Sequence, residues 1–302
     1  MADMGSCLSN PPPAILRLPI IKPMVSIIIP TKNEEKNLPF ILRSIQAQTF
    51  KDVEVIVADA GSTDQTRAIA ASFGARVIEG GLPGTGRNRG AAAAKGDILI
   101  FFDADIVLPD PWFLQATIAE FEKRGLGLAT CKMDPLSSKF VDKAMHEVFN
   151  FFMWVASGIS PHAPGFCIFA RRSIHEAIGG FDEEIRLAED HDYVARGAKY
   201  GKFGILKSYR IPVSVRRMER DGRFNIAMKY ILAELYMQTH GQIKTDVFNY
   251  QFAHYDGQRG KKLSREEFKR RLEAVLQLAK EDAKASFHMT KGTPRKKAAK
   301  KK

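Results

Sequence analysis

Apolar residues between positions 25 and 102 follow two spacings that alternate along the chain, and each spacing predicts a different element. Short runs that are continuously apolar and rich in β-branched residues predict buried strands, whereas apolar residues three or four positions apart predict helices with one buried face. The predicted strands are 25–29, 53–58, 76–78 and 98–102, and the predicted helices are 34–46, 64–73 and 87–95. This repeated order predicts an α/β fold, a doubly wound and mostly parallel sheet with flanking helices.

The pattern after residue 111 is mixed, and it ends in a predicted C-terminal helical extension. The expected helices are 112–123, 139–156 and 189–200, and the expected strands are 126–130, 166–170, 203–207 and 213–216. Helices beyond the sheet are predicted at 224–238 and 264–286, joined by a polar link at 241–263. The helix at 139–156 is rich in Phe, Met and Trp. This composition fits either core packing or an interfacial helix that faces a lipid-linked acceptor.

Composition narrows the class and the compartment. An apolar content of 45% over 302 residues is ordinary for a globular protein. Cys7, Cys131 and Cys167 are odd in number and far apart, so they predict neither a zinc site nor a disulfide framework. We therefore expect a reducing, cytoplasmic location. No apolar run approaches the roughly 18 residues that a spanning helix needs, and we expect no signal peptide at the N-terminus.

The net charge of +12 is concentrated at the C-terminus. Seven basic residues and no acidic residue lie within 291–302: Lys291, Arg295, Lys296, Lys297, Lys300, Lys301 and Lys302. Such a tail is either a solvated, disordered end or a segment attracted to anionic lipid headgroups. The second interpretation predicts a peripheral protein on the cytoplasmic face of a membrane. We expect no specific binding of nucleic acid, since the body lacks a zinc-finger, RNP or KH pattern.

Two carboxylates, Asp103 and Asp105, directly follow the apolar run 98–102. Ligands of open α/β sheets bind at the carboxyl ends of the strands. A carboxylate pair there suits a hard divalent cation that keeps water and phosphate oxygens as its other ligands. The alternative is an ordinary Asp-rich turn, because Asp is a favoured turn residue.

Polar clusters lie after the other predicted strands as well. They are 30–34, 59–64 and 84–90. The third cluster belongs to an expected glycine-rich loop before the helix at 87–95, but it matches neither the G-x-G-x-x-G fingerprint nor a Walker A loop. Arg87 and Arg89 would meet phosphate oxygens at the start of that helix, or they are solvated side chains on a plain loop.

An acidic cluster, Glu189-Asp190-His191-Asp192, opens the helix predicted at 189–200 and follows a turn at Gly179–Glu183. Acidic residues in a first helical turn are favoured by the helix dipole, which is sufficient to explain them. The functional alternative makes one carboxylate a general base that takes a proton from an attacking hydroxyl.

The order and spacing of these clusters over residues 24–218 resemble family 2 glycosyltransferases with the GT-A fold. The segments that carry the resemblance are Ile29–Glu34, Asp59–Asp64, Arg87–Gly90, Asp103–Asp105 (a DXD motif), Gly179–Glu183 and Glu189-Asp190. The resemblance implies a nucleotide-sugar donor, a Mn or Mg ion and an inverting, direct displacement.

Roles follow from the resemblance residue by residue. The nucleoside pocket would be lined by Pro30, Thr31, Asn33, Glu34 and Asp59. Arg87 would approach the donor's diphosphate or base. Asp103 and Ala104 would face the ribose and sugar, and Asp105, together with Asp103, would bind the metal. Asp190 would be the base, with Glu189 and His191 beside it on the acceptor side.

The chain departs from the family pattern at two positions of the base pocket. Lys32 stands where an aromatic residue is common, and Ala60 stands where a second Asp is common. Both departures leave the donor base open. Arg216-Arg217 resembles a basic pair found in some members, which would pair with the diphosphate or lie solvated on the surface.

Our interpretation is a metal-dependent, inverting glycosyltransferase of the hexosyltransferase type that moves the sugar to an acceptor hydroxyl. The candidate acceptors are a lipid-linked glycan and a cell-envelope glycan. The predicted parts are a lead-in at 1–23, a GT-A domain at 24–218, a helical extension at 219–290 and the tail at 291–302. One alternative is a sugar-phosphate nucleotidyltransferase, whose glycine-rich signature normally follows the first strand. The other is a non-catalytic membrane- or polyanion-binding module on the same fold.

Overall fold

The computed structural model describes residues 24–157, 161–185, 187–227, 237 and 242. The predicted lead-in, the helix at 264–286, its polar link and the basic tail lie outside the described residues, as does most of the helix at 224–238. The elements are β1 (Val25–Thr31), α1 (Leu38–Gln46), β2 (Val53–Asp59), α2 (Thr66–Ser72), β3 (Arg76–Glu79), α3 (Pro83–Ala93), β4 (Ile98–Phe102), α4 (Phe113–Lys123), β5 (Leu128–Pro135), α5 (Phe140–Ala156), β6 (Cys167–Arg171), α6 (Arg172–Ala177), α7 (Glu189–Gly197), β7 (Phe203–Val213) and α8 (Arg216–Asp221).

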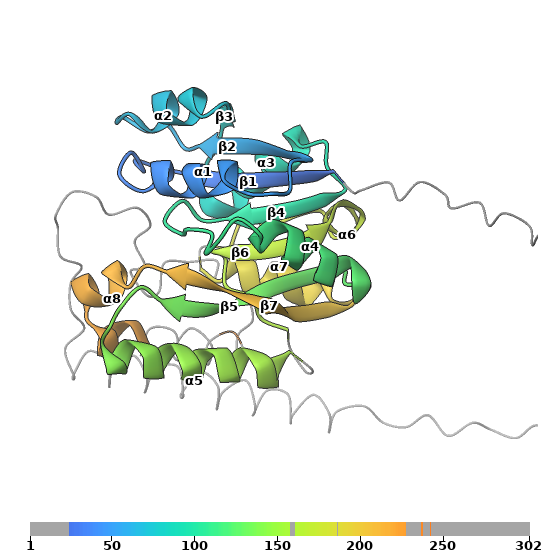
Figure 1. Cartoon of the computed structure of the whole chain (residues 1–302). Coiled ribbons are helices and arrows are strands. Elements are labelled where there is room, and N and C mark those ends of the chain that lie inside the picture. Colours follow the sequence, from blue (N-terminus) through green and yellow to red (C-terminus); the bar gives the residue numbers. More distant parts are fainter. Residues whose placement is uncertain (1–23, 158–160, 186, 228–236, 238–241, 243–302) are drawn as a thin grey trace, which may run out of the picture.

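One seven-stranded sheet carries the fold, in the order β3-β2-β1-β4-β6-β5-β7 (Figure 1). β1 runs parallel to both β2 and β4, and β3 continues the parallel arrangement beside β2. β6 is antiparallel to both of its neighbours, β4 and β5. The predicted α/β fold with a doubly wound, mostly parallel sheet is therefore confirmed.

Residues of the central strands alternate between two cores, one on each face of the sheet. In β1, Ile27 and Ile29 pack with residues of α1 and α4, whereas Ile28 packs with residues of α3, α6 and α7. In β4, Phe102 belongs to the first core and Phe101 to the second. Helices thus cover both faces of the sheet. Both faces of these strands are therefore buried, which explains why their sequences are continuously apolar and do not alternate between apolar and polar residues.

The predicted glycine-rich loop before Arg87 is wrong in its second half, because α3 already begins at Pro83. Two of its glycines let the helix approach the sheet. A Cβ on Gly90 would lie 2.3 Å from Cγ2 of Ile28, and one on Gly86 would lie 3.2 Å from Cβ of Pro30. These glycines serve helix–sheet packing, so the pattern that suggested a loop belongs to a buried helix.

The end of the predicted sheet also differs. The two short strands expected at 203–207 and 213–216 are one strand, β7, and Arg216 starts the helix α8 instead. The register between β5 and β7 shifts between Cys131 and Lys132. The shift lies opposite Leu206–Arg210 of β7, where the apolar alternation of that strand is interrupted. The interruption explains why the sequence predicts two short strands where the structure has one. The helix α6 was missed because its six residues are too few to show a helical period.

The topology places the predicted site at one edge. β2, β1 and β4 are neighbours and parallel, so their carboxyl ends, at Asp59, Thr31 and Phe102, lie on the same edge of the sheet. The polar segments that follow these strands are therefore brought together by the fold itself.

Candidate active site

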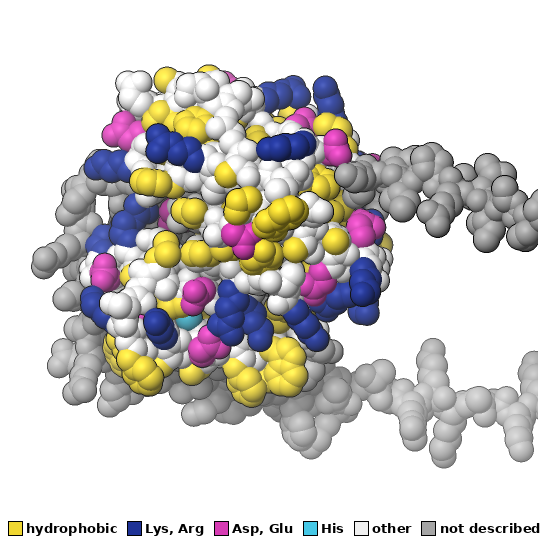
Figure 2. Space-filling model, viewed as in Figure 1, with side chains coloured by type: hydrophobic (Ala, Val, Ile, Leu, Met, Phe, Trp, Pro, Cys, Tyr) yellow, Lys and Arg dark blue, Asp and Glu magenta, His cyan; other side chains and the backbone are white. Residues whose placement is uncertain are grey.

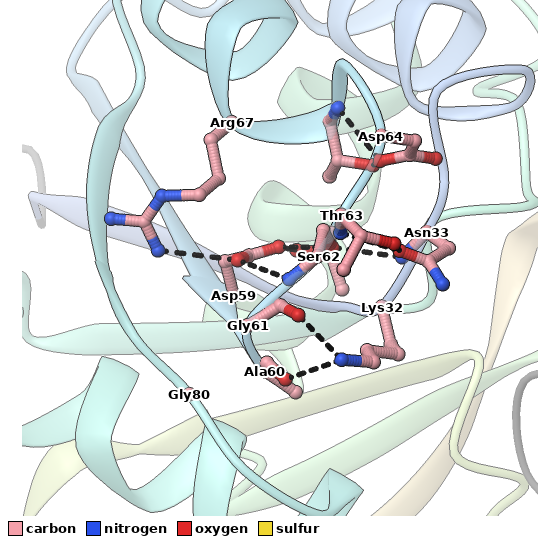
Figure 3. A network of polar contacts seen from close by, with 12 residues as sticks. Lys32, Asn33, Asp59, Ala60, Gly61, Ser62, Thr63, Asp64, Arg67 and Gly80 are labelled. Atoms are coloured by element: carbon pink, nitrogen blue, oxygen red, sulfur yellow. Dashed lines mark hydrogen bonds and ion pairs between the residues drawn. The ribbon is translucent and has the colours of Figure 1, made fainter.

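The loops after β1 and β2 form one polar network (Figure 3). Asp59, whose side chain is fully buried, accepts hydrogen bonds from Thr31 Oγ1 (3.1 Å), from Ser62 Oγ (2.5 Å) and its backbone N–H (3.0 Å), and from Arg67 (3.2 Å). Burial alone would raise the pKa of Asp59, but the hydrogen bonds from Ser62, Arg67 and Thr31 outweigh it and lower that pKa below 3.8. Asp59 is thus an ionised anchor beneath the loop.

Lys32 crosses from the end of β1 to the loop after β2 (Figure 3). Its ammonium donates to the carbonyl oxygens of Ala60 (3.0 Å) and Gly61 (2.5 Å). Asn33 adopts a left-handed backbone conformation (φ 54°), and its side-chain oxygen accepts the backbone N–H of Thr63 (2.9 Å). Lys32 and Asn33 therefore fix the two loops against each other.

The remaining residues expected at the nucleoside pocket lie in the same place. The backbone N–H of Glu34 donates to Thr66 Oγ1 (2.7 Å), and the Glu34 side chain accepts from Asn37 (2.8 Å). Pro30 lies against α3, as the close approach of Gly86 indicates. The structure thus brings together Pro30, Thr31, Asn33, Glu34 and Asp59; their contact with a nucleoside stays a prediction.

A second cluster forms around Arg87, whose side chain is only 3% exposed. Its guanidinium donates to Glu189 Oε1 (2.7 Å), to Asp103 Oδ1 (3.0 Å) and to the carbonyl oxygen of Gly165 (3.2 Å). It also lies over the ring of Phe181, 5.4 Å from the centroid. One arginine therefore joins α3, the end of β4, the segment before β6 and the start of α7.

The two acidic residues at the start of α7 face this arginine. Burial is the main reason that the pKa values of Glu189 and Asp190 are raised, and Arg87 acts in the opposite direction on both. Backbone N–H groups of His191 and Gly165 also favour the charged form of Asp190. A raised pKa gives the Asp190 carboxylate a higher proton affinity than an ordinary Asp, while Arg87 limits that rise by favouring the ionised form.

Local backbone geometry aims these carboxylates. Ala188, the residue before α7, has a left-handed conformation (φ 64°), which costs a residue with a Cβ about 1–2 kcal/mol. On the other side, Gly165 leaves room for the cluster. A Cβ on Gly165 would lie 2.7 Å from an Arg87 nitrogen and 3.1 Å from Asp190 Oδ2.

The substitution Gly165→Ala should therefore disturb the site. The added methyl group would displace either the Arg87 guanidinium, which Glu189 and Asp103 hold in place, or the Asp190 carboxylate. We expect a loss of roughly 1–3 kcal/mol of stability from overpacking and at least a tenfold loss of catalytic rate. Urea unfolding and a transfer assay measure the two effects. The matched control is Gly125→Ala, in the turn between α4 and β5, where a Cβ meets nothing within 4 Å but the positive φ of 58° costs an Ala about 1–2 kcal/mol. It should lose a similar amount of stability and keep its activity; activity in Gly165→Ala equal to that of the control would contradict this geometry.

The turn at Gly179–Glu183 holds α3 in position. Asn88 donates to the carbonyl oxygen of Phe181 and to Glu183, and accepts the backbone N–H of Phe181. Thr85 also donates to Glu183 (2.8 Å). The ring of Phe181 stacks on Tyr193, with centroids 3.9 Å apart. This sequence motif therefore acts as a support for Arg87 rather than as a contact surface.

Asp103 and Asp105 lie at the end of β4 with Ala104 buried between them. The Asp103 side chain is 39% exposed and faces Arg87, and that of Asp105 is 38% exposed and lies 3.6 Å from Arg216. Among the described residues, no three or more His, Cys, Asp or Glu side chains are grouped to form a metal cage. Two accessible carboxylates nevertheless fit a Mg²⁺ or Mn²⁺ ion whose other ligands are water and substrate phosphates.

Sequence reasoning missed several contributors to the site. Gly165 and His162 carry no motif that would single them out, and the pairing of Arg216 with Asp105 depends on the start of α8. His162 packs edge-on against His191, with ring centroids 4.7 Å apart. Arg89, in contrast, turns away from the cluster and donates to the carbonyl oxygen of Gly80 (2.6 Å).

Known proteins resemble this chain both in sequence and in fold. A sequence profile described as glycosyl transferase family 2 matches residues 26–179, just over half of the chain. The 4,4'-diaponeurosporenoate glycosyltransferase of Staphylococcus haemolyticus is 38% identical over 109 residues, which cover 33% of this chain and 29% of that protein. The chain thus matches about a third of the length of the first curated relatives.

Solved structures share the fold at low sequence identity. The mannosyltransferase PcManGT from Pyrobaculum calidifontis, solved with GDP-Man and Mn²⁺, has a TM-score of 0.59 at 18% identity, covering 89% of this chain and 76% of that one. TarS 1–349 of S. aureus, solved with UDP-GlcNAc, has a TM-score of 0.53 at 21% identity, covering 70% and 66%. At these identities the likeness concerns the fold.

Proposed function

The chain belongs to glycosyl transferase family 2, and we propose that it is a metal-dependent, inverting glycosyltransferase that moves a sugar from a nucleotide-sugar donor to an acceptor hydroxyl. One observation supports this proposal above the others. The carboxyl edge of β2, β1 and β4 brings the loops around Lys32 and Asp59 onto the same side as Asp103, Asp105 and the buried Arg87. An elongated ligand with a base at one end and a diphosphate at the other fits such an edge.

The nucleoside end of the donor would lie against the loops after β1 and β2. The side chain of Asp59 is engaged by Thr31, Ser62 and Arg67, so it would shape the pocket rather than bond the base directly. Lys32 holds the carbonyl groups of Ala60 and Gly61, and it would present a positive charge to the base. Relatives in fold bind GDP-Man in one case and UDP-GlcNAc in another, so both bases stay candidates here.

The diphosphate end would lie at the exit of β4. Asp105, with Asp103, would hold a Mn or Mg ion, which when bound neutralises negative charge on the departing diphosphate. Arg216 lies beside Asp105 and would turn to the phosphate oxygens once the carboxylate has a cation to bind. Ala104 and Asp103 would face the ribose and the sugar.

The transfer step assigned to this chain needs a base on the acceptor side. Asp190 would take the proton from the acceptor hydroxyl, and the oxygen would attack the anomeric carbon of the sugar. The bond from that carbon to the diphosphate oxygen breaks, and its electron pair leaves with the nucleoside diphosphate. Arg87 favours the ionised form of Asp190 and holds Glu189 in place, and Glu189 and His191 would border the acceptor.

The metal role of Asp105 gives a direct test. We expect Asp105→Ala to abolish the Mn-dependent part of the thermal stabilisation by a nucleoside diphosphate, because the phosphates and the protein would no longer share a cation. A ligand present at 100 times its Kd stabilises a protein by about 2.7 kcal/mol, so the loss of the Mn-dependent stabilisation is measurable by thermal shift. Asp110→Ala, at a half-buried Asp before α4 that accepts from Tyr209 and from the backbone N–H of Trp112, is the control. A Mn-dependent shift that is unchanged in Asp105→Ala would reject the assignment.

The two alternatives to this function keep their own tests. Release of pyrophosphate from a nucleoside triphosphate and a sugar phosphate would establish a nucleotidyltransferase, although the glycines of 80–90 follow the third strand rather than the first. Salt-sensitive binding of a polyanion without any reaction of nucleotide sugars would establish a non-catalytic module.

Within the described residues, no helix is long and apolar enough to cross a bilayer. Attraction of the basic tail to anionic lipid, and the domain boundaries, stay predictions.

A further inference from the structure

The helix α5 turns a broad apolar face away from the protein. Its residues Phe140, Val148, Phe151 and Trp154 are 85%, 69%, 63% and 60% exposed. Further exposed apolar side chains on the same helix are Val141, Phe152 and Val155. Figure 2 shows apolar side chains gathered along the lower edge of the molecule, over the place where Figure 1 draws α5. Core packing, the simpler interpretation from sequence, does not account for this face.

The polar residues of α5 lie on the opposite, inner face. Asp142, His146 and Asn150 are spaced four apart, and all three are buried. Asp142 accepts from Ser137 (2.6 Å) and from Arg223 (2.9 Å), and Asn150 both donates to and accepts from the backbone of Met133. The bond from Arg223 is the main reason that the pKa of Asp142 falls to about 2. These bonds fix which side of the helix faces β5, so the apolar face cannot roll inward.

The charge around α5 favours an anionic partner. Both carboxylates of the helix are ion-paired with arginines, Asp142 with Arg223 and Glu147 with Arg210. Lys143 and Lys139, of which Lys139 is paired with Glu219 (3.0 Å), lie at its N-terminal end, and the whole chain carries a net charge of +12. Two copies of such a chain repel each other, which argues against a second copy as the partner.

The shape of the face also favours a lipid surface. α5 has 17 residues, a length of about 25 Å, and it lies beside the end of the sheet formed by β5 and β7 (Figure 1). A helix whose solvent-exposed face carries Phe, Val and Trp suits insertion into the boundary between the headgroups and acyl chains of a membrane, where Trp is enriched. A row of ring contacts then leads from Phe152 to His162 (5.9 Å) and on to His191, next to Asp190.

We propose that the outer face of α5 is a docking surface for an anionic lipid membrane. Phe140, Val148, Phe151 and Trp154 enter the lipid boundary, and the basic residues of the chain supply the attraction to acidic headgroups. The contact is peripheral. It concerns where the protein docks, so its test is independent of the proposed transfer. If that transfer is also correct, the ring contacts from Phe152 to His191 lead from this face toward Asp190.

The two tryptophans of the chain allow a direct experiment on the full-length protein. Trp112→Phe leaves Trp154 as the sole tryptophan, and Trp154→Phe leaves Trp112, which is similarly exposed at 57% on α4's N-terminal side. Each variant is mixed with vesicles of phosphatidylcholine alone or with phosphatidylglycerol. We expect Trp154 emission to shift to the blue and to be quenched by brominated acyl chains in anionic vesicles, and Trp112 emission to stay unchanged.

Cosedimentation supplies the second measurement. Trp154→Asp should weaken vesicle binding about tenfold or more, whereas Trp112→Asp should leave it unchanged. Three results would overturn the proposal. They are vesicle binding without any change in Trp154 emission, a Trp154 already shielded from acrylamide before vesicles are added, and a lipid-free dimer that Trp154→Asp dissociates. The second result would mean that the chain covers the face itself, and the third that a second copy does.

Discussion

The substitution Asp190→Asn should lower the rate of sugar transfer by about 10²–10⁴-fold while leaving donor binding almost unchanged. The amide has nearly the shape of the carboxylate and can still accept the backbone N–H of His191, which donates to Asp190 at 2.9 Å. It cannot take the proton of an acceptor hydroxyl. The effect should therefore appear in kcat, with the Kd of the nucleotide sugar within about twofold of the native value.

The control is Asp192→Asn in the same helix. Asp192 pairs with Arg196 one turn further along and lies in no predicted catalytic position. Its substitution should spare kcat. Transfer at the native rate in Asp190→Asn would reject the role of this residue as the base and move attention to Glu189.

The pH dependence of the reaction follows from the same carboxylate. Burial raises the pKa of Asp190 above its ordinary value of 3.8. The base works only when ionised, so kcat/KM should fall as the pH decreases through this raised pKa. Because Asp190 and Glu189 interact, the measured value belongs to the pair. An acid limb at or below the ordinary Asp value would contradict the buried position of the base.

The substitution Arg87→Met should destabilise the protein by roughly 3–5 kcal/mol, the usual cost of removing one partner from a buried ion pair. Glu189 would be left buried without its cation, whereas Asp103 is 39% exposed and adds less because water screens it. Urea unfolding measures the loss. Arg210→Met, which removes an exposed pair with Glu147, is the control and should cost less than 1 kcal/mol.

The loss in Arg87→Met should depend on pH in a known direction. Burial already raises the pKa of Glu189, and removing Arg87 would raise it further. A group with a raised pKa in the folded state costs no stability below its unfolded pKa, and stability is lost as the pH rises through the folded value. The destabilisation should thus be small in acid and full near neutral pH. The double variant Arg87→Met/Glu189→Gln should recover part of it; no recovery, or a loss no larger than in Arg210→Met, would contradict the cluster.

The sequence was sufficient to predict the parts of the fold that rest on periodicity. The apolar run at 98–102 coincides with β4, and the helical spacing at Leu38–Ile45 lies within α1. Asp103, Glu189 and Arg87 each belong to a motif that the sequence shows, and the structure joins them through the Arg87 guanidinium. The contact between these side chains depends on the packing of α3 and α7 against the sheet, which brings together Arg87 and Glu189, 102 positions apart in the chain.

Other features could not be predicted because no local pattern encodes them. Gly165 matters only because Arg87 and Asp190 occupy the space where its side chain would be. The sequence marks Lys32 only as a departure in the predicted base pocket, and its role depends on the carbonyl groups of the loop after β2. The direction of α5 was open because its apolar and polar residues define two faces without indicating which one meets β5; Asp142 and Asn150 decide it through their buried bonds.

The central claim is that this chain breaks the bond between the sugar and the nucleoside diphosphate of a nucleotide sugar at the edge formed by β2, β1 and β4. The sugar passes to a hydroxyl, for which water stands in when no other acceptor is supplied. The most direct test incubates the full-length protein with a panel of UDP-, GDP-, CDP- and ADP-sugars and Mn, and quantifies the nucleoside diphosphate released by anion-exchange chromatography. The account predicts that one base is preferred and that Asp105→Ala and Asp190→Asn each suppress its release at least a hundredfold. Consumption of no nucleotide sugar, or equal release by the native protein and both variants, would contradict it.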